Sequence, residues 1–184
     1  MLYCVIVPCF YVLSKAGCVI EPNSDGHVDV PNTWTSIGNG AFGGCRSLAS
    51  ITIPDSVTSI GNGAFDGCSN LASIAIPDSV TTIGEWAFND CSNLASITIG
   101  DGVKEMDEKT FRRCTSLITV NVGNSLITIP KFAFDRCMKL ESVILGKKVA
   151  KISDGAFIRC FALRSINLPD GLVEIGDNAF QQSG

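Results

Sequence analysis

Nine cysteines and one histidine are the residues of this chain best suited to nucleophilic or metal chemistry. Six of the cysteines recur at intervals of 23 residues and form no C-x-x-C pair; they are Cys45, Cys68, Cys91, Cys114, Cys137 and Cys160. Such a column predicts small buried side chains that point the same way, with an occasional disulfide as the alternative. Zinc has little support, because paired cysteines are missing and only one imidazole is present. Cys4, Cys9 and Cys18 precede the column and could behave differently.

The single histidine, His27, follows Gly26 and is expected in a surface turn. A Cys–His nucleophilic pair would need a cysteine and an orienting group beside it, and the sequence sets up neither. It also contains no phosphate-binding glycine motif, no G-x-S-x-G and no H-E-x-x-H. Paired carboxylates such as Asp107 and Glu108 fall on turns without a pocket. We therefore predict no catalytic, metal-binding or cofactor-binding residues, and no enzyme.

The elements that would position any functional residue are set by an internal repeat. Phenylalanines recur every 23 residues, and a cysteine and then a leucine follow at steps of three; the phenylalanines are Phe42, Phe65, Phe88, Phe111, Phe134, Phe157 and Phe180. Four more apolar columns keep this register without insertion or deletion. The unit reads A-F-x-x-C-x-x-L-x-S-I-x-I-P-x-x-V-x-x-I-G. A lone unit buries too little to be stable, so the columns predict stacked coils around one shared core.

Each unit contains two extended segments and one segment with apolar residues at helical spacing. Residues 50–54 alternate in polarity and are β-branched, which predicts a short strand with its isoleucines facing inward. A second extended stretch spans 57–61, and Gly61 is expected to permit a sharp corner after it. Residues 64–71 place alanine, phenylalanine, cysteine and leucine so that a turn or two of helix is predicted. The expected rise per coil is about 4.7–5 Å, the spacing between strands.

The pattern L-x-x-I-x-I-P-x-x-V-x-x-I-G-x-x-A-F-x-x-C resembles the BspA-like leucine-rich repeats, which have 23-residue units. The resemblance implies a leucine-rich-repeat solenoid of about 6.5 repeats over residues 28–184, with short parallel β-strands, short helical turns and one strand ladder per face. It also implies a non-enzymatic surface or secreted protein with an adhesion-like role. It defines no catalytic residues to carry over.

Residues 1–27 form an N-terminal segment outside the repeat register. Its apolar run, 2–13, is too short to span a bilayer, and no membrane insertion of the repeats is expected. Three interpretations remain open for the first twenty residues: a secretory signal, a degenerate cap, and an incorrect or truncated start. At the other end, the sequence stops in mid-repeat at Gly184, and the polar cap that solenoids need is not evident. Three interpretations are open here as well: residues 181–184 are a minimal cap, the natural protein is longer, or the chains associate end to end.

Two surfaces are candidates for partner binding. The first consists of outward strand positions, which form a rigid surface at low entropic cost: Ser50, Thr52, Ser73, Ser96, Thr98, Thr119, Asn121, Ser142, Ile144, Ser165 and Asn167. The alternative is that small polar residues simply fit a crowded solvent face. The second is a basic patch in the irregular repeats of the second half: Lys104, Arg112, Arg113, Lys131, Lys147 and Lys148.

The leading functional hypothesis is therefore a protein-interaction module with a protein partner and no cofactor. A net charge of −4 and a pI of about 4.9 argue against a nucleic-acid partner. A secreted or cell-surface location is favoured, with a cytoplasmic one still open. The competing hypotheses are a structural spacer or self-assembling body, and a Ser/Thr array that binds an ordered lattice such as ice or a polysaccharide.

Overall fold

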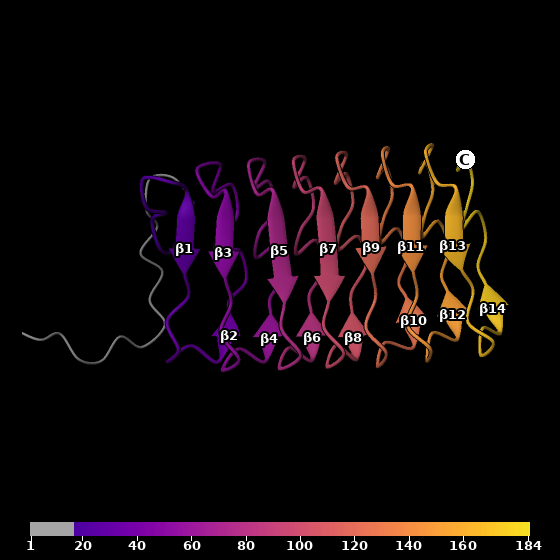
Figure 1. The fold of residues 1–184 in the computed structure, drawn as a ribbon, viewed down its shortest axis with the longest axis horizontal. Coiled ribbons are helices and arrows are strands. Elements are labelled where there is room, and N and C mark those ends of the chain that lie inside the picture. The colour runs from indigo at the N-terminus through magenta and orange to yellow at the C-terminus, as the bar shows by residue number, and fades with distance from the viewer. Residues whose placement is uncertain (1–16) are drawn as a thin grey trace, which may run out of the picture.

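The structure, a computed structural model, describes residues 17–184 as flattened coils stacked along one axis (Figure 1). Cys4, Cys9 and most of the segment proposed as a secretory signal lie outside these residues. Each coil contributes one strand to each of two ladders, which run side by side along the axis. The predicted solenoid with one strand ladder per face is therefore confirmed.

The first ladder contains the odd-numbered strands, all parallel. They are β1 (His27–Asp29), β3 (Ser50–Thr52), β5 (Ser73–Ile76), β7 (Ser96–Ile99), β9 (Thr119–Asn121), β11 (Ser142–Ile144) and β13 (Ser165–Asn167). β1 pairs with β3, and β5 to β13 form one five-stranded sheet. Ser73 faces Ser96, Ser96 faces Thr119, and every other pair keeps the same 23-residue offset. The repeat period of the sequence is therefore the register of the sheet.

The second ladder contains the even-numbered strands, also parallel. They are β2 (Ser36–Ile37), β4 (Ser59–Ile60), β6 (Thr82–Ile83), β8 (Glu105–Met106), β10 (Thr128–Ile129), β12 (Lys151–Ile152) and β14 (Glu174–Ile175). They form a four-stranded sheet from β2 to β8 and a three-stranded sheet from β10 to β14.

The third segment of each coil is a run of turns. The described residues contain no α-helix, so the predicted helical turns are wrong. Gly63 and Gly67 have φ of 59° and 70°, in the left-handed region that interrupts a right-handed helix. The backbone donors then serve the next coil: the N–H of Phe65 donates to the carbonyl of Ala87 at 2.7 Å. Hydrogen bonds that a helix would make internally instead join the coils.

We call the outer surface of these segments the turn face; it comprises residues 38–48, 61–71, 84–94, 107–117, 130–140, 153–163 and 176–184.

The predicted role of Gly61, the first residue of one of these segments, also needs correction, because Gly61 has no positive φ. A Cβ there would lie 2.7 Å from the backbone nitrogen of Asn39 in the preceding coil. Asn39 Oδ1 accepts the N–H of Asn62 at 2.8 Å. Gly61 is therefore required by close contact between coils, rather than by a sharp corner.

The phenylalanine column forms the centre of the core. Six of the seven rings are fully buried, from Phe42 to Phe157. Successive rings lie nearly parallel, with centroids 5.0–5.4 Å apart and interplanar angles of 2–8°. This separation is close to the rise expected from strand spacing. Burial of each ring contributes about 1.5–3 kcal/mol of hydrophobic free energy, before the conformational entropy lost on folding is subtracted. The stack is therefore a large part of what holds neighbouring coils together.

Candidate interaction surfaces

The outward positions of the odd-numbered strands form one continuous surface, which we call the strand face. In the five-stranded sheet they align in two rows. One row is Ser73, Ser96, Thr119, Ser142 and Ser165, and the other is Ala75, Thr98, Asn121, Ile144 and Asn167. Exposed or half-buried outward residues alternate with buried inward ones along most strands. All eleven candidate positions lie on odd-numbered strands from β3 to β13, which follow one another in a row along the solenoid (Figure 1).

Ile144 and Asn167 lie in the row that also contains Ala75 and Asn121, and they have the most distinctive contacts of that row. Ile144 is an apolar side chain that is 54% exposed. Asn167 makes backbone-like contacts with the neighbouring coil: its Nδ2 donates to the carbonyl of Leu145 at 3.2 Å, and its Oδ1 accepts the N–H of Leu145 at 2.6 Å. The side chain of Asn167 therefore hydrogen-bonds to the preceding coil, whereas the side chain of Ile144 can make an apolar contact with a partner.

His27 lies on the strand face as the first residue of β1, and its predicted place in a surface turn is wrong. Its Nδ1 is 2.7 Å from Ser50 Oγ, and its Nε2 is 3.1 Å from Asp29 Oδ1 and 3.2 Å from Thr52 Oγ1. Hydrogen bonds from His27 and then Thr52 lower the pKa of Asp29 below its usual 3.8. Sequence reasoning missed this group, although His27 and Ser50 are one repeat period apart and must therefore be neighbours.

Serine, histidine and aspartate together are the residue types of a nucleophilic triad, but this group does not have a triad's setting. It lies on an open strand surface, where Asp29 and Thr52 are exposed. A nucleophilic serine also needs converging donors that stabilise an oxyanion in a water-excluded site. We conclude that the four side chains hold one another in place and give this end of the strand face a mixed polar character.

The six residues of the predicted basic patch occupy three separate parts of the coil. Lys104 immediately precedes β8, and Lys147 and Lys148 follow β11. Arg112, Arg113 and Lys131 are on the turn face, and each pairs with a carboxylate: Asp135 at 3.1 Å, Asp90 at 3.4 Å and Asp154 at 3.1 Å, respectively. The contact with Asp154 raises the pKa of Lys131 and lowers that of Asp154. The structure therefore does not bring the six cations together in one patch.

A buried carboxylate organises part of the turn face. The side chain of Asp135 is 7% exposed, and its oxygens lie 3.1 Å from Arg112 Nε, 3.8 Å from Arg136 Nε and 4.0 Å from Arg159 Nη1. Sequence reasoning did not single out Asp135, Arg136 or Arg159. The 23-residue spacing from Arg112 to Asp135, and from Arg136 to Arg159, was the available signal.

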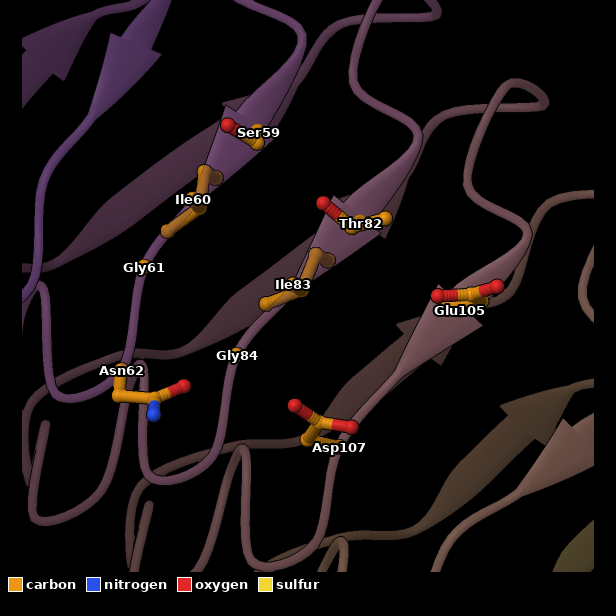
Figure 2. A pocket seen from close by; sticks show the side chains of 9 residues that line it. All are labelled: Ser59, Ile60, Gly61, Asn62, Thr82, Ile83, Gly84, Glu105 and Asp107. Carbon is orange, nitrogen blue, oxygen red and sulfur yellow. The ribbon is translucent and has the colours of Figure 1, made fainter.

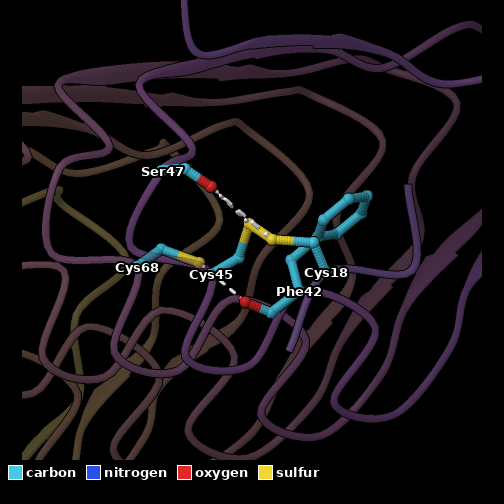
Figure 3. Close-up of a disulfide and its surroundings, with 5 residues drawn as sticks. All are labelled: Cys18, Phe42, Cys45, Ser47 and Cys68. Carbon is cyan, nitrogen blue, oxygen red and sulfur yellow. Dashed lines mark hydrogen bonds between the residues drawn. A yellow bond between two sulfur atoms is a disulfide. The ribbon is translucent and has the colours of Figure 1, made fainter. Parts of the chain in front are cut away.

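The cysteine column is buried, as predicted, and five of its members are free thiols. Each of these thiols donates to the carbonyl of a phenylalanine in the preceding coil; Cys68 Sγ lies 2.9 Å from the oxygen of Phe42 (Figure 3). Burial raises the pKa of Cys68 and of Cys160 to about 12. Because the thiolate is the reactive form, these cysteines are structural.

Cys45, the first member of the column, forms a disulfide with Cys18, with their Cα atoms 5.1 Å apart (Figure 3). Cys18 lies outside the repeat register and is buried. The N–H of Val19 donates to the carbonyl of Ala41 at 2.8 Å. The segment that begins at Gly17 is thus joined to the first complete coil by a covalent bond and by the backbone.

A shallow depression crosses β4, β6 and β8 on the second ladder. Figure 2 shows that side chains such as Ser59, Thr82 and Glu105 project side by side from successive strands rather than toward one point. Asn62 and Asp107 lie at the lower ends of these strands in the same view.

Across residues 17–184, no group of three or more His, Cys, Asp or Glu side chains could hold a metal ion. No helix in this part of the chain is long and apolar enough to cross a membrane.

Comparison with known proteins places this architecture. The model of the BspA type leucine-rich repeat region, with six copies, matches residues 24–129 and 58–184. A leucine-rich repeat protein from Bacteroides ovatus ATCC 8483 is 36% identical with a TM-score of 0.80 over 86% of this chain, which spans only 41% of that protein. The T. pallidum leucine-rich repeat protein is 36% identical with a TM-score of 0.77, over 82% of this chain and 72% of that one.

A leucine-rich repeat protein from Eubacterium ventriosum ATCC 27560 shares the fold, with a TM-score of 0.59, 24% identity, and coverage of 92% of this chain and 47% of that one. No curated protein matches the sequence. Repeat solenoids of this kind present extended surfaces suited to protein interaction. The family model spans nearly all the described coils, and the 23-residue register seen in the sheets is the register of its repeat. The chain therefore belongs to the BspA-type leucine-rich repeat family.

Proposed function

We propose that this chain is a non-enzymatic protein-interaction module that binds its partner through the strand face. The observation that carries the proposal is the alignment of outward residues in two rows across β5 to β13. Hydrogen-bonded strands hold these side chains rigidly, so binding costs little additional conformational entropy. Small hydroxyl groups along the rows let a partner backbone approach closely, and Ile144 offers it an exposed apolar contact.

The proposal extends to the compartment, which we assign as the cell surface or the secreted fraction. The disulfide between Cys18 and Cys45 supports this assignment, because stable disulfides persist mainly in oxidising environments. An adhesion-like role would use a rigid surface of this kind outside the cell.

Paired substitutions on neighbouring strands test the binding surface. Thr98→Arg with Asn121→Arg places two long cations at adjacent outward positions of β7 and β9. The matched control, Asn70→Arg with Asn93→Arg, makes the same charge change one repeat apart at exposed turn positions. Each protein is immobilised and titrated with a surface-protein extract. Saturable binding that the strand-face pair abolishes and the turn pair retains supports the proposal.

Two other results would reject it. If both pairs reduce binding equally, the strand face is not the binding surface. If the protein binds nothing saturably and its scattering mass rises with concentration, the chain is a self-assembling structural body.

A further inference from the structure

We infer that the turn face of the central coils carries a second interaction surface, which fits an extended acidic segment of a partner protein. Each coil has two backbone positions with positive φ. The first position is occupied by Gly40, Gly63, Trp86, Lys109, Phe132, Gly155 and Asn178. The second is occupied by Gly44, Gly67, Asp90, Arg113, Arg136, Arg159 and Gln182.

Glycine is the residue that this backbone conformation favours, because it lacks the Cβ that crowds the left-handed region. The first two of these coils use glycine at both positions, whereas Trp86, Phe132 and three arginines occupy them farther along. Residues held in disfavoured backbone conformations cluster where function requires them. Backbone stability alone would favour glycine throughout, so we assign the exceptions to function.

Three of the four exceptions at the first position lie on consecutive coils, and we define them as the aromatic row: Trp86, Lys109 and Phe132. The fourth is Asn178 in the last coil. Trp86 is 40% exposed and Phe132 is 36% exposed, and Lys109 Nζ lies 5.3 Å from the Trp86 ring centroid. The ring of Phe132 covers Gly155 so closely that a Cβ there would lie 2.5 Å from it. Both rings are thus packed against a neighbouring coil and remain partly exposed, so each can anchor an apolar group of a partner.

Three of the five exceptions at the second position form an arginine row, which we define as Arg113, Arg136 and Arg159; the other two are Asp90 and Gln182. The arginine side chains are 43%, 34% and 39% exposed. Of the carboxylates paired with these arginines, Asp135 is 7% exposed and Asp90 is 44% exposed. Lys109 of the aromatic row lies 3.1 Å from Glu85 and 4.0 Å from Glu108, which are 45% and 48% exposed. Along the arginine row, a partner would therefore meet more guanidinium groups than exposed carboxylates, and guanidinium groups bind carboxylates through paired hydrogen bonds.

The two rows run side by side along the solenoid axis, four residues apart in each coil. Tryptophan and arginine are enriched among the residues that dominate binding at protein interfaces, and arginine clusters recognise acidic motifs. Neighbouring coils repeat at about the 5.1–5.4 Å that separates their core rings. Side chains on one face of an extended peptide repeat about every 6.5 Å, a difference that flexible arginines can span. A peptide with alternating acidic residues thus fits the arginine row.

The test replaces two arginines by the residue that other coils use. Arg136→Gly with Arg159→Gly leaves Arg112 beside Asp135, and Gly44 and Gly67 show that glycine suits these positions. Binding of a Glu-Ser repeat peptide to the full chain is measured by calorimetry. We expect saturable binding by the native protein and a loss of at least about tenfold in affinity in the variant, with a thermal midpoint that is unchanged or higher.

Lys147→Ala with Lys148→Ala is the matched control, since it removes two positive charges from exposed positions outside the turn face. It should bind the peptide as the native protein does, and so should the strand-face pair Thr98→Arg and Asn121→Arg. That second comparison separates this surface from the strand face. If the glycine variant melts earlier, Arg136→Gln with Arg159→Gln repeats the test without backbone change.

Any of the following results would overturn the inference. One is the absence of saturable binding of the Glu-Ser peptide by the native protein. Another is equal binding of a Lys-Ser peptide of the same length, or an equal loss of affinity in the lysine control. The last is tight binding of heparin by the arginine row without binding of the peptide, which would assign the surface to a sulfated polysaccharide.

Discussion

The thiol of Cys114 donates a hydrogen bond across the coil boundary to the backbone carbonyl of Phe88, with Sγ 3.2 Å from the oxygen. The other free cysteines of the column repeat this contact one coil apart. Where the column reaches residue 183, a serine hydroxyl makes the equivalent bond to Phe157, at 2.6 Å. The column therefore requires a small buried side chain that also donates a hydrogen bond.

This contact predicts a difference between two replacements of Cys114. Cys114→Ala removes the donor and leaves a small cavity, and should lower the free energy of unfolding by about 1–3 kcal/mol. Cys114→Ser retains a donor and should be less destabilising than the alanine variant by about 1 kcal/mol. Urea unfolding followed by circular dichroism measures both. Equal stability of the two variants would show that the hydrogen bond contributes nothing.

The phenylalanine stack predicts a large effect from one truncation at its centre. Phe88 is fully buried between Phe65 and Phe111, so Phe88→Ala should cost about 3–5 kcal/mol. The control is Phe161→Ala, because that side chain is 54% exposed and its removal should change stability by less than about 1 kcal/mol. Urea melts that give similar losses for the two variants would mean that the stack is not the core.

The buried thiols predict that stability falls in alkaline solution. The pKa of Cys68 is about 12 in the folded chain against an ordinary 9.0, and burial raises the pKa of Cys91, Cys114 and Cys137 well above 9.0. Above about pH 9 the unfolded chain therefore binds fewer protons than the folded one. The stabilisation is complete below pH 9 and is lost as pH rises, at up to about 1.4 kcal/mol per pH unit for each thiol.

Unfolding of the native protein and of Cys114→Ser, measured between pH 8 and pH 11, checks this prediction. The variant should show a shallower decline, by about the contribution of one thiol. Parallel pH dependences would contradict the proposed linkage, and so would alkylation of the thiols in the folded protein at pH 8.

The carboxylate beneath the arginines predicts a cost for neutralising it. Asp135→Asn should lower the free energy of unfolding by about 2–4 kcal/mol, because Arg112 would lose its partner in a largely buried setting. Asp154→Asn is the matched control, since Asp154 and Lys131 are each about half exposed and solvent screens such a pair, so its loss should change stability much less. Thermal melts at low salt compare them. A neutral effect of Asp135→Asn would mean that solvent already screens the arginines.

The strands and the core could be predicted because the repeat has no insertions, so each apolar column had to share one environment. The helical turn could not be excluded, because Phe65, Cys68 and Leu71 have the same three-residue spacing in a run of turns as in a helix. The left-handed positions are visible as Gly63 and Gly67, but most later coils have other residues at one or both of these positions.

The two candidate surfaces were not equally predictable. The strand face followed from alternation in the strands, whereas the six basic residues had been grouped by their nearness in sequence. In a solenoid, residues 23 apart are neighbours, and that rule would have found His27 with Ser50 and Arg112 with Asp135. The disulfide of Cys18 followed no such rule, because Cys18 lies outside the register.

The ladder of hydrogen bonds on the turn face has an evolutionary consequence. Each coil offers N–H groups to the following coil and carbonyl groups to the preceding one, as the contact from Phe65 to Ala87 illustrates. A tandem duplication of any 69-base-pair stretch that encodes one 23-residue unit would therefore insert a coil that fits both of its neighbours at once. Such a protein can change length in a single genetic event, and each new copy can then acquire surface residues of its own while the interior remains unchanged.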